Sequence, residues 1–260
     1  METKKLFLQS TELNQDVFDF GTYRVGYFIR KNIDKSPENE DSLFFYGQDG
    51  QWVCGVSDGV GGHPKGKEAS QIASQGVLEF FAKKGFGHQI FLANLEAINK
   101  KIRDLKVGAK TTITSALVKK DQIRLYSIGD SEVLLCNTKG QLIYSNIPQS
   151  PVGYGVEAGL LSQEEALDDP DRHIVNHLLG DEVLRFEASS SIDFKKGYSL
   201  LLGTDGIFDN IHQDTLLEII GGGQYEESFQ KLCQGFQGED LDLKKDDDIS
   251  FFFIRRVRSE

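Results

Sequence analysis

The order of apolar segments along the chain constrains the fold more than any other feature. Short runs rich in β-branched and aromatic residues predict strands at residues 22–33, 43–47, 52–57, 111–118, 123–128, 132–137, 199–202 and 249–257. Apolar residues at helical spacing predict two pairs of helices, at residues 67–84 and 88–105 and at residues 215–220 and 225–236. Strands and helices thus occur in groups rather than in strict alternation. This order indicates an α+β fold in which two antiparallel sheets are covered by helix pairs.

Residues 149–180 interrupt this pattern. The segment opens with Gly, Pro and Ser, continues through an acidic stretch, and has helical character over residues 172–179. We interpret it as an excursion from the core. The chain has no internal repeat and no low-complexity linker, so nothing marks a boundary between domains.

The bulk properties exclude some partners and locations. The net charge of −11 disfavours binding to nucleic acid or to an anionic membrane, and it favours a basic partner or a divalent cation. The start of the chain lacks a sustained apolar segment, which argues against a signal peptide. Three isolated cysteines predict buried free thiols in a reducing compartment. We therefore expect a soluble cytoplasmic protein with no membrane partner.

A glycine-rich stretch, SDGVGGHPKGKEAS at residues 57–70, admits two interpretations. Gly61, Gly66 and Lys67 match the G-x-x-x-x-G-K pattern of a loop that cradles nucleotide phosphates. Glu68, however, stands where that loop needs Ser or Thr, and its carboxylate would repel phosphate. Pro64 also removes a backbone N–H that such a loop uses. The alternative is that Asp58 belongs to a metal site.

Acidic residues stand at one end of five apolar strands. They are Glu40 and Asp41, Asp58, Asp130, Asp205 with Asp209, and Asp246 to Asp248. If these strands lie side by side, the carboxylates converge and repel one another, and divalent cations would relieve that repulsion. Ligand sets made of oxygen favour Mg²⁺ or Mn²⁺ over zinc. Two such ions can clamp a phosphoryl group for in-line displacement.

Six motifs appear in the order seen in one enzyme family. They are Asn39-Glu40-Asp41, residues 57–63, Thr111-Thr112, Gly129-Asp130-Ser131, residues 203–209 and residues 247–250. With them the chain resembles the metal-dependent type 2C, or PPM, serine/threonine protein phosphatases in their compact bacterial form, over a core of about residues 22–256. The resemblance implies a single domain over residues 1–260, built as a four-layer α-β-β-α sandwich. It also implies hydrolysis of phosphoserine and phosphothreonine by a metal-bridging hydroxide, without a phosphoenzyme.

The resemblance assigns roles to single residues. Asp58 would bridge two Mn²⁺ or Mg²⁺ ions. Asp41 would either bind an ion directly or contact the residues that do, and both acids would act in catalysis. The carbonyl of Gly59 would bind one ion, and Asp205 and Asp247 would bind the other. Glu40 would act through water, and Asp130 with Asp205 or Asp209 would hold a third ion. Residues 149–180 correspond to a flap beside the site. The implied partners are a phosphorylated protein and a cognate serine/threonine kinase, with the chain itself a monomer.

Three departures from the family pattern bear on activity. Ser36 stands where an arginine usually clamps the phosphate, so Lys35 or Arg30 would have to replace it. Val60 stands where relatives often place a histidine, which leaves a metal-bound water or His63 to protonate the leaving group. Asp248 replaces a common asparagine.

The missing arginine motivates an alternative function, a phosphoprotein-binding regulatory module of the same fold with little or no activity. Beside the last motif, Lys244 and Lys245 are interpreted as a solvated turn.

Overall fold

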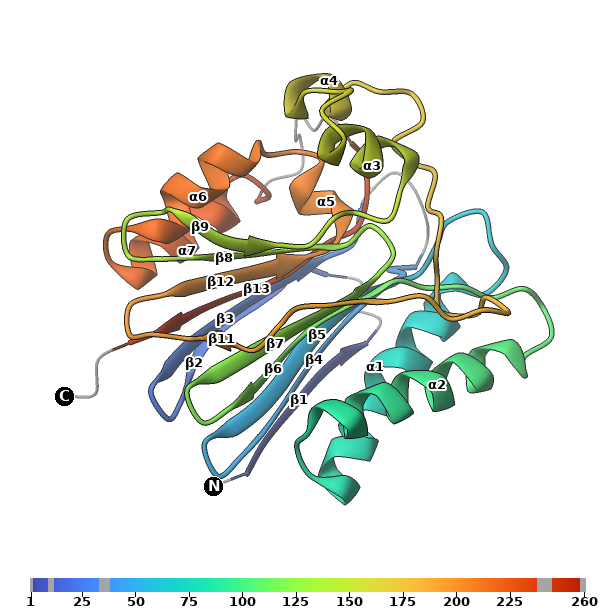
Figure 1. The fold of residues 1–260 in the computed structure, drawn as a ribbon, viewed down its shortest axis with the longest axis horizontal. Coiled ribbons are helices and arrows are strands. Elements are labelled where there is room, and N and C mark those ends of the chain that lie inside the picture. Colours follow the sequence, from blue (N-terminus) through green and yellow to red (C-terminus); the bar gives the residue numbers. More distant parts are fainter. Residues whose placement is uncertain (1, 9–11, 33–37, 238–244, 258–260) are drawn as a thin grey trace.

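Two antiparallel β-sheets lie face to face, and a pair of helices covers the outer face of each (Figure 1). The computed structural model describes residues 2–8, 12–32, 38–237 and 245–257. This arrangement confirms the predicted α+β sandwich.

All strand pairs in the described residues are antiparallel. In spatial order the first sheet contains β1 (Glu2–Leu8), β4 (Asp41–Gln48), β5 (Gln51–Asp58), β6 (Ile113–Lys119), β7 (Gln122–Ile128) and β10 (Glu187–Ala188), and β11 (Ile192–Asp193) also pairs with β7. The second sheet contains β2 (Asn14–Phe20), β3 (Tyr23–Arg30), β13 (Ile249–Arg256), β12 (Ser199–Gly203), β8 (Glu132–Cys136) and β9 (Leu142–Ser145).

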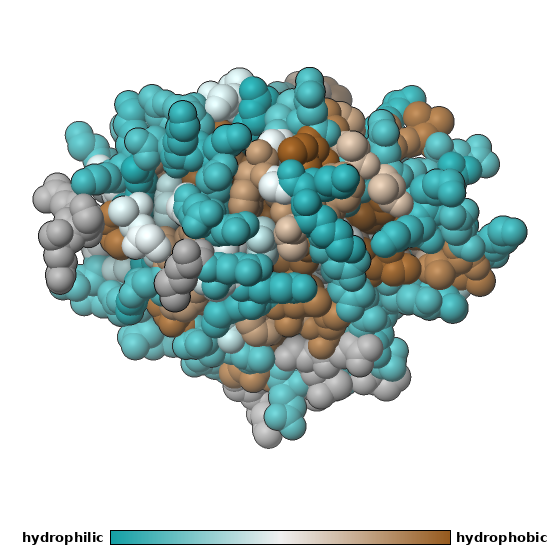
Figure 2. All heavy atoms as spheres, turned by 90° about the horizontal axis from the view of Figure 1, so that it is seen from below, coloured by the Kyte–Doolittle hydropathy of each residue, from teal (hydrophilic) through white to brown (hydrophobic). Residues whose placement is uncertain are grey.

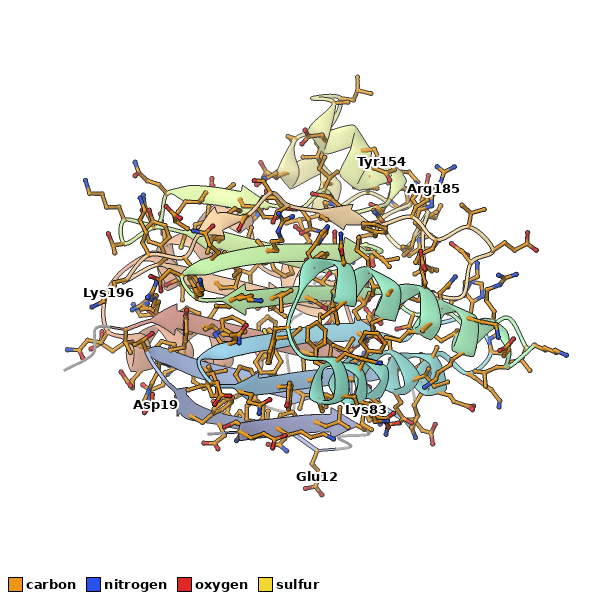
Figure 3. The ribbon with its side chains drawn as sticks, turned by 60° about the horizontal axis from the view of Figure 1, so that its bottom comes forward. Glu12, Asp19, Lys83, Tyr154, Arg185 and Lys196 are labelled. Carbon is orange, nitrogen blue, oxygen red and sulfur yellow. The ribbon has the colours of Figure 1, made fainter. Side chains whose placement is uncertain are left out.

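The helices divide between the two sheets. The first sheet carries α1 (Gly66–Lys84) and α2 (His88–Arg103), which run along its outer face (Figure 3). The second sheet carries α6 (Gln213–Gly221) and α7 (Tyr225–Gln234). Near the ends of the strands lie α3 (Pro151–Glu157), α4 (Gln163–Leu167) and α5 (Asp205–Phe208) (Figure 1).

The central strands are apolar on both faces because both faces are covered. Successive side chains of a strand point to opposite sides. In β4, Leu43 and Phe45 enter the core between the sheets, and Phe44 and Tyr46 pack beneath α1 and α2. Continuous apolar runs, rather than alternating ones, are therefore the sequence mark of this sandwich.

Strand β13 repeats this division in the second sheet. Phe252 and Ile254 enter the core between the sheets, and Phe251 and Phe253 face α6 and α7. Fully burying one such side chain contributes about 1.5–3 kcal/mol. This core holds the two sheets together, and the acids of residues 246–248 come directly before β13.

Two parts of the sequence-based prediction are wrong. The core begins before residue 22, since β1 and β2 form an edge of each sheet. These edge strands carry charged residues among partly exposed apolar ones, so their signal is weaker. Residues 172–179 are irregular instead of helical. Backbone hydrogen bonds fix them, from Asn176 to the carbonyl of Gln149 and between Leu179 and Thr111.

Hydrophilic side chains cover most of the face shown in Figure 2, with apolar ones between them. None of the helices in the described ranges has the length and apolar character needed to cross a bilayer. Cys54, Cys136 and Cys233 are buried free thiols, as predicted.

Replacing Phe252 by alanine tests the core between the sheets. The side chain is fully buried, so we expect Phe252→Ala to lower the free energy of unfolding by about 3–5 kcal/mol. Leu142→Ala, at a side chain that is 40% exposed, should change it by less than about 0.5 kcal/mol. Chemical denaturation of both variants measures the difference, and equal losses would contradict this description of the core.

Candidate metal centre

Two carboxylates of the first sheet stand opposite each other, where β4 begins and β5 ends. Asp41 and Asp58 are directly paired in the antiparallel register, so their side chains share one face. Two threonines fix the backbone of Asp58. The Thr111 hydroxyl and the Thr112 N–H both donate to its carbonyl, at 2.6 and 2.9 Å, and its N–H donates to Thr112 Oγ1 at 3.0 Å. The threonine pair noted in the sequence therefore holds the end of β5.

The second sheet brings further carboxylates to the same edge. Asp205 follows β12 and begins α5, Asp209 caps the C-terminal end of α5, and Asp247 precedes β13. Because β12 and β13 are antiparallel neighbours, the end of β12 lies beside the start of β13, and these acids lie at the same edge of the sheet. The contact between α5 and the β13 approach is very close. A Cβ atom on Gly206 would lie 2.0 Å from the Asp248 carbonyl oxygen, so this position requires glycine.

Thr204 joins the two sheets at this point. Its hydroxyl donates to Asp41 Oδ2 at 3.0 Å and accepts a hydrogen bond from the Ser250 N–H at 3.2 Å. Its own N–H donates to the Ser250 carbonyl at 2.9 Å. Residues from β4, β12 and β13 are thus linked within one buried network.

Asp248 organises the backbone around the site. Its two carboxylate oxygens accept hydrogen bonds from the N–H groups of Asn32 and Glu40, both at 2.8 Å. An asparagine has a single side-chain oxygen and cannot reproduce both contacts with separate oxygens. This gives a structural reason for the acid at this position.

Asp130 lies in the connection between β7 and β8, and Glu132 is the first residue of β8. Gly129 has a φ of 99°, which favours glycine, and the Gly129 N–H donates to Gln149 Oε1 at 2.9 Å. The Gln149 N–H donates to the Gly129 carbonyl, also at 2.9 Å. The start of the flap is therefore tied to the turn that carries Asp130.

Burial and mutual repulsion raise the pKa of these acids. Burial raises the pKa of Asp58 well above its usual value, and Asp41, Asp205, Asp247 and Asp130 raise it further in that order. The pKa of Asp41 is also raised well above its usual value, chiefly by burial.

The acids nearer the flap behave in the same way. Burial and the neighbouring Asp205 raise the pKa of Asp130 to about 7 and that of Asp209 to about 6. Burial and Asp209 raise the pKa of Glu132 to about 8. Because each acid acts on the others, they form one group. We call it the acidic cluster: Asp41, Asp58, Asp130, Glu132, Asp205, Asp209 and Asp247.

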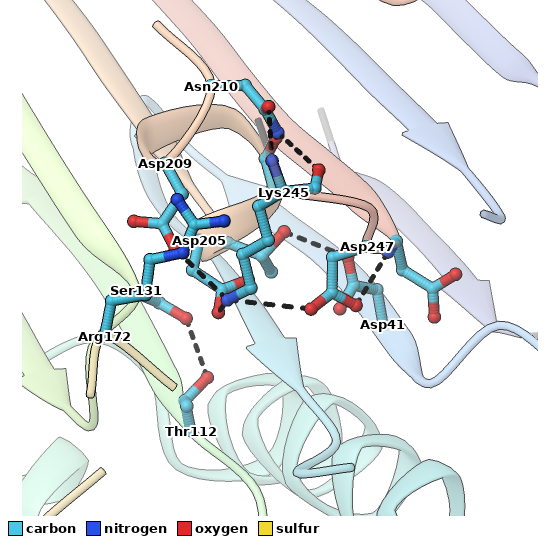
Figure 4. Close-up of polar contacts among 12 residues, drawn as sticks. Asp41, Thr112, Ser131, Arg172, Asp205, Asp209, Asn210, Lys245 and Asp247 are labelled. Atoms are coloured by element: carbon cyan, nitrogen blue, oxygen red, sulfur yellow. Dashed lines mark hydrogen bonds and ion pairs between the residues drawn. The ribbon is translucent and has the colours of Figure 1, made fainter. Parts of the chain in front are cut away.

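A lysine lies inside the acidic cluster (Figure 4). Lys245 Nζ forms an ion pair with Asp205 and lies 3.2 Å from Asp209 Oδ2 and 3.6 Å from Asp247 Oδ2. Burial lowers the pKa of Lys245, but these three carboxylates outweigh burial and the pKa is raised overall. The prediction of a solvated turn is wrong for Lys245, and Lys244 lies outside the described residues.

The donors of the acidic cluster fit a hard divalent cation. They are all oxygens, as Mg²⁺ and Mn²⁺ prefer. Asp41 Oδ1 is buried and has no hydrogen-bond partner among the described residues, so it retains acceptor capacity. In the part of the chain that the structure describes, however, no three acidic, His or Cys side chains are already arranged around one point. Asp205, Asp209 and Asp247 are instead engaged with Lys245.

Some of the other predicted site residues border the acidic cluster, and others lie away from it. Gly59 and Glu40 border the acidic cluster, joined by a hydrogen bond of 3.1 Å from the Gly59 N–H to the Glu40 carbonyl. His63 is exposed in the turn before α1. Arg30 donates to the Phe236 carbonyl at 2.6 Å, beside the outer helices. That placement is at odds with its expected role in phosphate binding.

Lys35 and Ser36, the other two residues considered in connection with phosphate binding, lie outside the described residues.

A cavity of about 200 Å³ opens between the acidic cluster and the flap. Its lining includes four residues of the acidic cluster, Asp130, Glu132, Asp205 and Asp209; four residues of the flap, Val152, Val156, Leu167 and Arg172; and Phe208 and Ile211. The Arg172 guanidinium donates to the Leu167 carbonyl, and its charge lowers the pKa of Asp209, against the larger effects of burial and Asp205. A guanidinium and the carboxylates thus share one cavity.

Four site residues were missed in the sequence. Thr204, Glu132 and Lys245 each stand one or two positions from a predicted acid, so proximity along the chain was an available signal. Arg172 had no such signal, because the path of the flap brings it to the site.

The chain is similar to known proteins in sequence. The family model for protein phosphatase 2C matches residues 30–245. The serine/threonine protein phosphatase PstP of Mycobacterium tuberculosis is 29% identical over 209 residues, which cover 75% of this chain and 38% of PstP. The chain therefore spans well under half the length of that relative. The serine/threonine phosphatase stp of Listeria welshimeri is 27% identical, covering 70% of this chain and 77% of that protein.

Solved structures share the fold. A bacterial serine phosphatase superposes with a TM-score of 0.77 at 23% identity, covering 91% of this chain and 98% of that one. The catalytic domain of PstP, crystallised with two manganese ions, superposes with a TM-score of 0.73 at 22% identity, covering 91% and 99%. At these identities the similarity establishes the fold alone.

Glu132 makes the stability of the metal-free protein depend on pH. Its pKa rises from 4.5 to about 8 on folding, so the folded state favours the protonated form. The contribution of Glu132 to the free energy of unfolding is therefore most favourable below about pH 4.5. It falls as the pH rises towards 8, by at most about 1.4 kcal/mol per pH unit. We expect Glu132→Gln to have the same free energy of unfolding as the wild type near pH 4. At pH 8 its free energy of unfolding should be higher than that of the wild type by at least about 1 kcal/mol. Urea denaturation in EDTA measures this, and a constant difference across the pH range would refute the assignment.

Proposed function

The chain belongs to the protein phosphatase 2C family, and from this premise we propose that it is a Mn²⁺- or Mg²⁺-dependent phosphatase acting on phosphoserine and phosphothreonine in proteins. The observation that carries the proposal is the acidic cluster, which lies where the two sheets meet and borders a cavity. A phosphate monoester is an anion, so this cluster would repel it unless cations were bound. Carboxylates in this arrangement are therefore suited to binding phosphate only together with metal ions.

The ligands would come from both sheets. Asp41 and Asp58 from the first sheet and Asp205 and Asp247 from the second would hold two ions, and Asp130 with Asp209 would hold a third. When bound, such ions supply Lewis acidity, drawing charge from phosphoryl oxygens and making water acidic enough to serve as a nucleophile near neutral pH. The protein's part is to position these ligands. Thr204 holds the Asp41 carboxylate, and Thr111 and Thr112 hold the backbone of Asp58.

Arg172 would bind the phosphate from the flap. It lines the same cavity as Asp130 and Asp209, and a guanidinium can contact two phosphate oxygens at once. Arg30, the arginine predicted for this role from the sequence, lies instead on the face of β3 beneath the outer helices and donates to the Phe236 carbonyl there. The phosphate would thus lie between the ions and Arg172.

The remaining parts of the proposal concern the cell. A cognate serine/threonine kinase would produce the phosphoprotein that this chain dephosphorylates. The buried free cysteines support a reducing compartment such as the cytoplasm.

Phosphate release tests the reaction. We expect Mn²⁺ or Mg²⁺ to support release from a phosphothreonine peptide, and EDTA to abolish it. Asp205→Asn and Asp247→Asn should each lower kcat/KM by more than about 100-fold, because loss of a ligand costs more than loss of a supporting contact.

Asp193→Asn, at an exposed acid on β11, is the matched control and should retain full activity. Unchanged turnover in both ligand variants would refute the metal assignment. Metal-dependent binding of the phosphopeptide with no release would favour the regulatory module.

Arg172→Gln tests phosphate binding from the flap. Loss of a charge-assisted contact should raise KM for the phosphopeptide about tenfold or more, with a smaller change in kcat. Arg172→Lys should recover part of the affinity, because a lysine keeps the charge but lacks the paired donors. Arg185→Gln, at an exposed arginine near the flap (Figure 3), should leave KM unchanged. An unaltered KM in Arg172→Gln would remove this residue from the site.

A further inference from the structure

Lys245 is held inside the acidic cluster by its own backbone. The Lys245 N–H donates to Asn210 Oδ1 at 3.0 Å, and Asn210 Nδ2 donates to the Lys245 carbonyl at 2.9 Å. The same Nδ2 lies 2.9 Å from the Gly206 carbonyl, within α5. Asn210 therefore joins the approach to β13 to the helix that begins with Asp205. This anchoring fixes the direction in which the lysine side chain leaves the backbone.

The Lys245 ammonium and a bound divalent cation would need the same oxygens. Nζ is paired with Asp205 and lies 3.2 Å from Asp209 Oδ2 and 3.6 Å from Asp247 Oδ2. A Mg²⁺ ion binds carboxylate oxygens at about 2.0–2.1 Å. An ion on Asp205 and Asp247 would then lie within a few ångströms of the ammonium, where two positive charges repel strongly in a partly buried site. The two cations exclude each other from these carboxylates.

We propose that Lys245 is an internal counter-ion that competes with the divalent cation for Asp205 and Asp247 and so sets the metal affinity of the site. Binding of the ion requires the lysine side chain to leave its three carboxylates. When no ion is bound, the lysine offsets the repulsion among these acids. This inference rests on the proposed metal site, and it adds a residue that the family resemblance does not assign.

The ion pair of Lys110 with Asp181 provides a matched comparison. Its atoms are 2.7 Å apart and its side chains are partly buried, as in the Lys245 pairs, but both residues lie outside the acidic cluster. Neutralising Lys110 removes a similar ion pair without changing the charge among the proposed ligands.

Calorimetric titration with MnCl₂ alone, without substrate, tests the proposal on the full chain. Lys245→Met should bind Mn²⁺ at least about tenfold more tightly than the wild type, because the competing charge is gone. Lys245→Gln, which keeps a polar side chain, should change in the same direction, and Lys110→Met should match the wild type. Equal or weaker binding in both Lys245 variants would overturn the proposal.

Thermal unfolding gives a second, independent readout. In EDTA, Lys245→Met should unfold at a lower temperature than the wild type, because the acids lose their counter-ion. Saturating Mn²⁺ should raise its Tm by more than it raises that of the wild type. An unchanged Tm in EDTA would contradict the role as counter-ion.

The outcomes separate this inference from the proposed function. If the wild type and Asp205→Asn both fail to bind Mn²⁺, the metal site and the proposed function fail, and this inference fails with them. If the wild type binds Mn²⁺ and releases phosphate, but Lys245→Met has an unchanged affinity, the inference about Lys245 alone is wrong.

Discussion

The cost of burying like charges side by side governs this structure. An ionised carboxylate loses strong hydration when it is buried, and each acid placed next to it adds repulsion. The fold nevertheless gathers seven carboxylates where its two sheets meet, and the raised pKa values of five of them, Asp41, Asp58, Asp130, Glu132 and Asp209, record that cost. Protonation relieves part of this cost, and positive charge lets the acids stay ionised together. Lys245 supplies part of that charge from within the chain, and the proposed function assigns the rest to divalent cations.

The frame around the acidic cluster is built to resist that repulsion. An apolar core holds the two sheets together, and two further cores attach the outer helices to them. At the site itself Thr204 links the sheets through Asp41, and Asp248 secures two backbone N–H groups. The tight contact at Gly206 leaves α5 little freedom to move away from β13. Phosphoryl transfer depends on positioning and charge stabilisation. In the proposed function, this frame would be the protein's main contribution once divalent cations replace Lys245 among the carboxylates.

The sequence predicts the central strands and their acids well, for a physical reason. Strands covered on both faces have continuous apolar runs such as Phe251-Phe252-Phe253, and an acid directly after such a run must lie at the sheet end. Edge strands such as β1 lack that signal. For Arg30 the sequence did hold a usable signal, the alternation of side chains along a strand. Arg30 lies two residues after Phe28, so both side chains point to the same face of β3, towards the outer helices. The position of Arg172 depends on the path of the flap, which local pattern does not encode. Lys245, by contrast, stands two residues before Asp247, so its place near the acids had a signal in the sequence.

Anomalous diffraction from crystals soaked in MnCl₂ would locate the bound ions. We expect strong manganese peaks among Asp41, Asp58, Asp205 and Asp247, with the Lys245 side chain withdrawn from its three carboxylates. Manganese bound elsewhere, or peaks absent from the acidic cluster while Lys245 stays in place, would contradict this expectation.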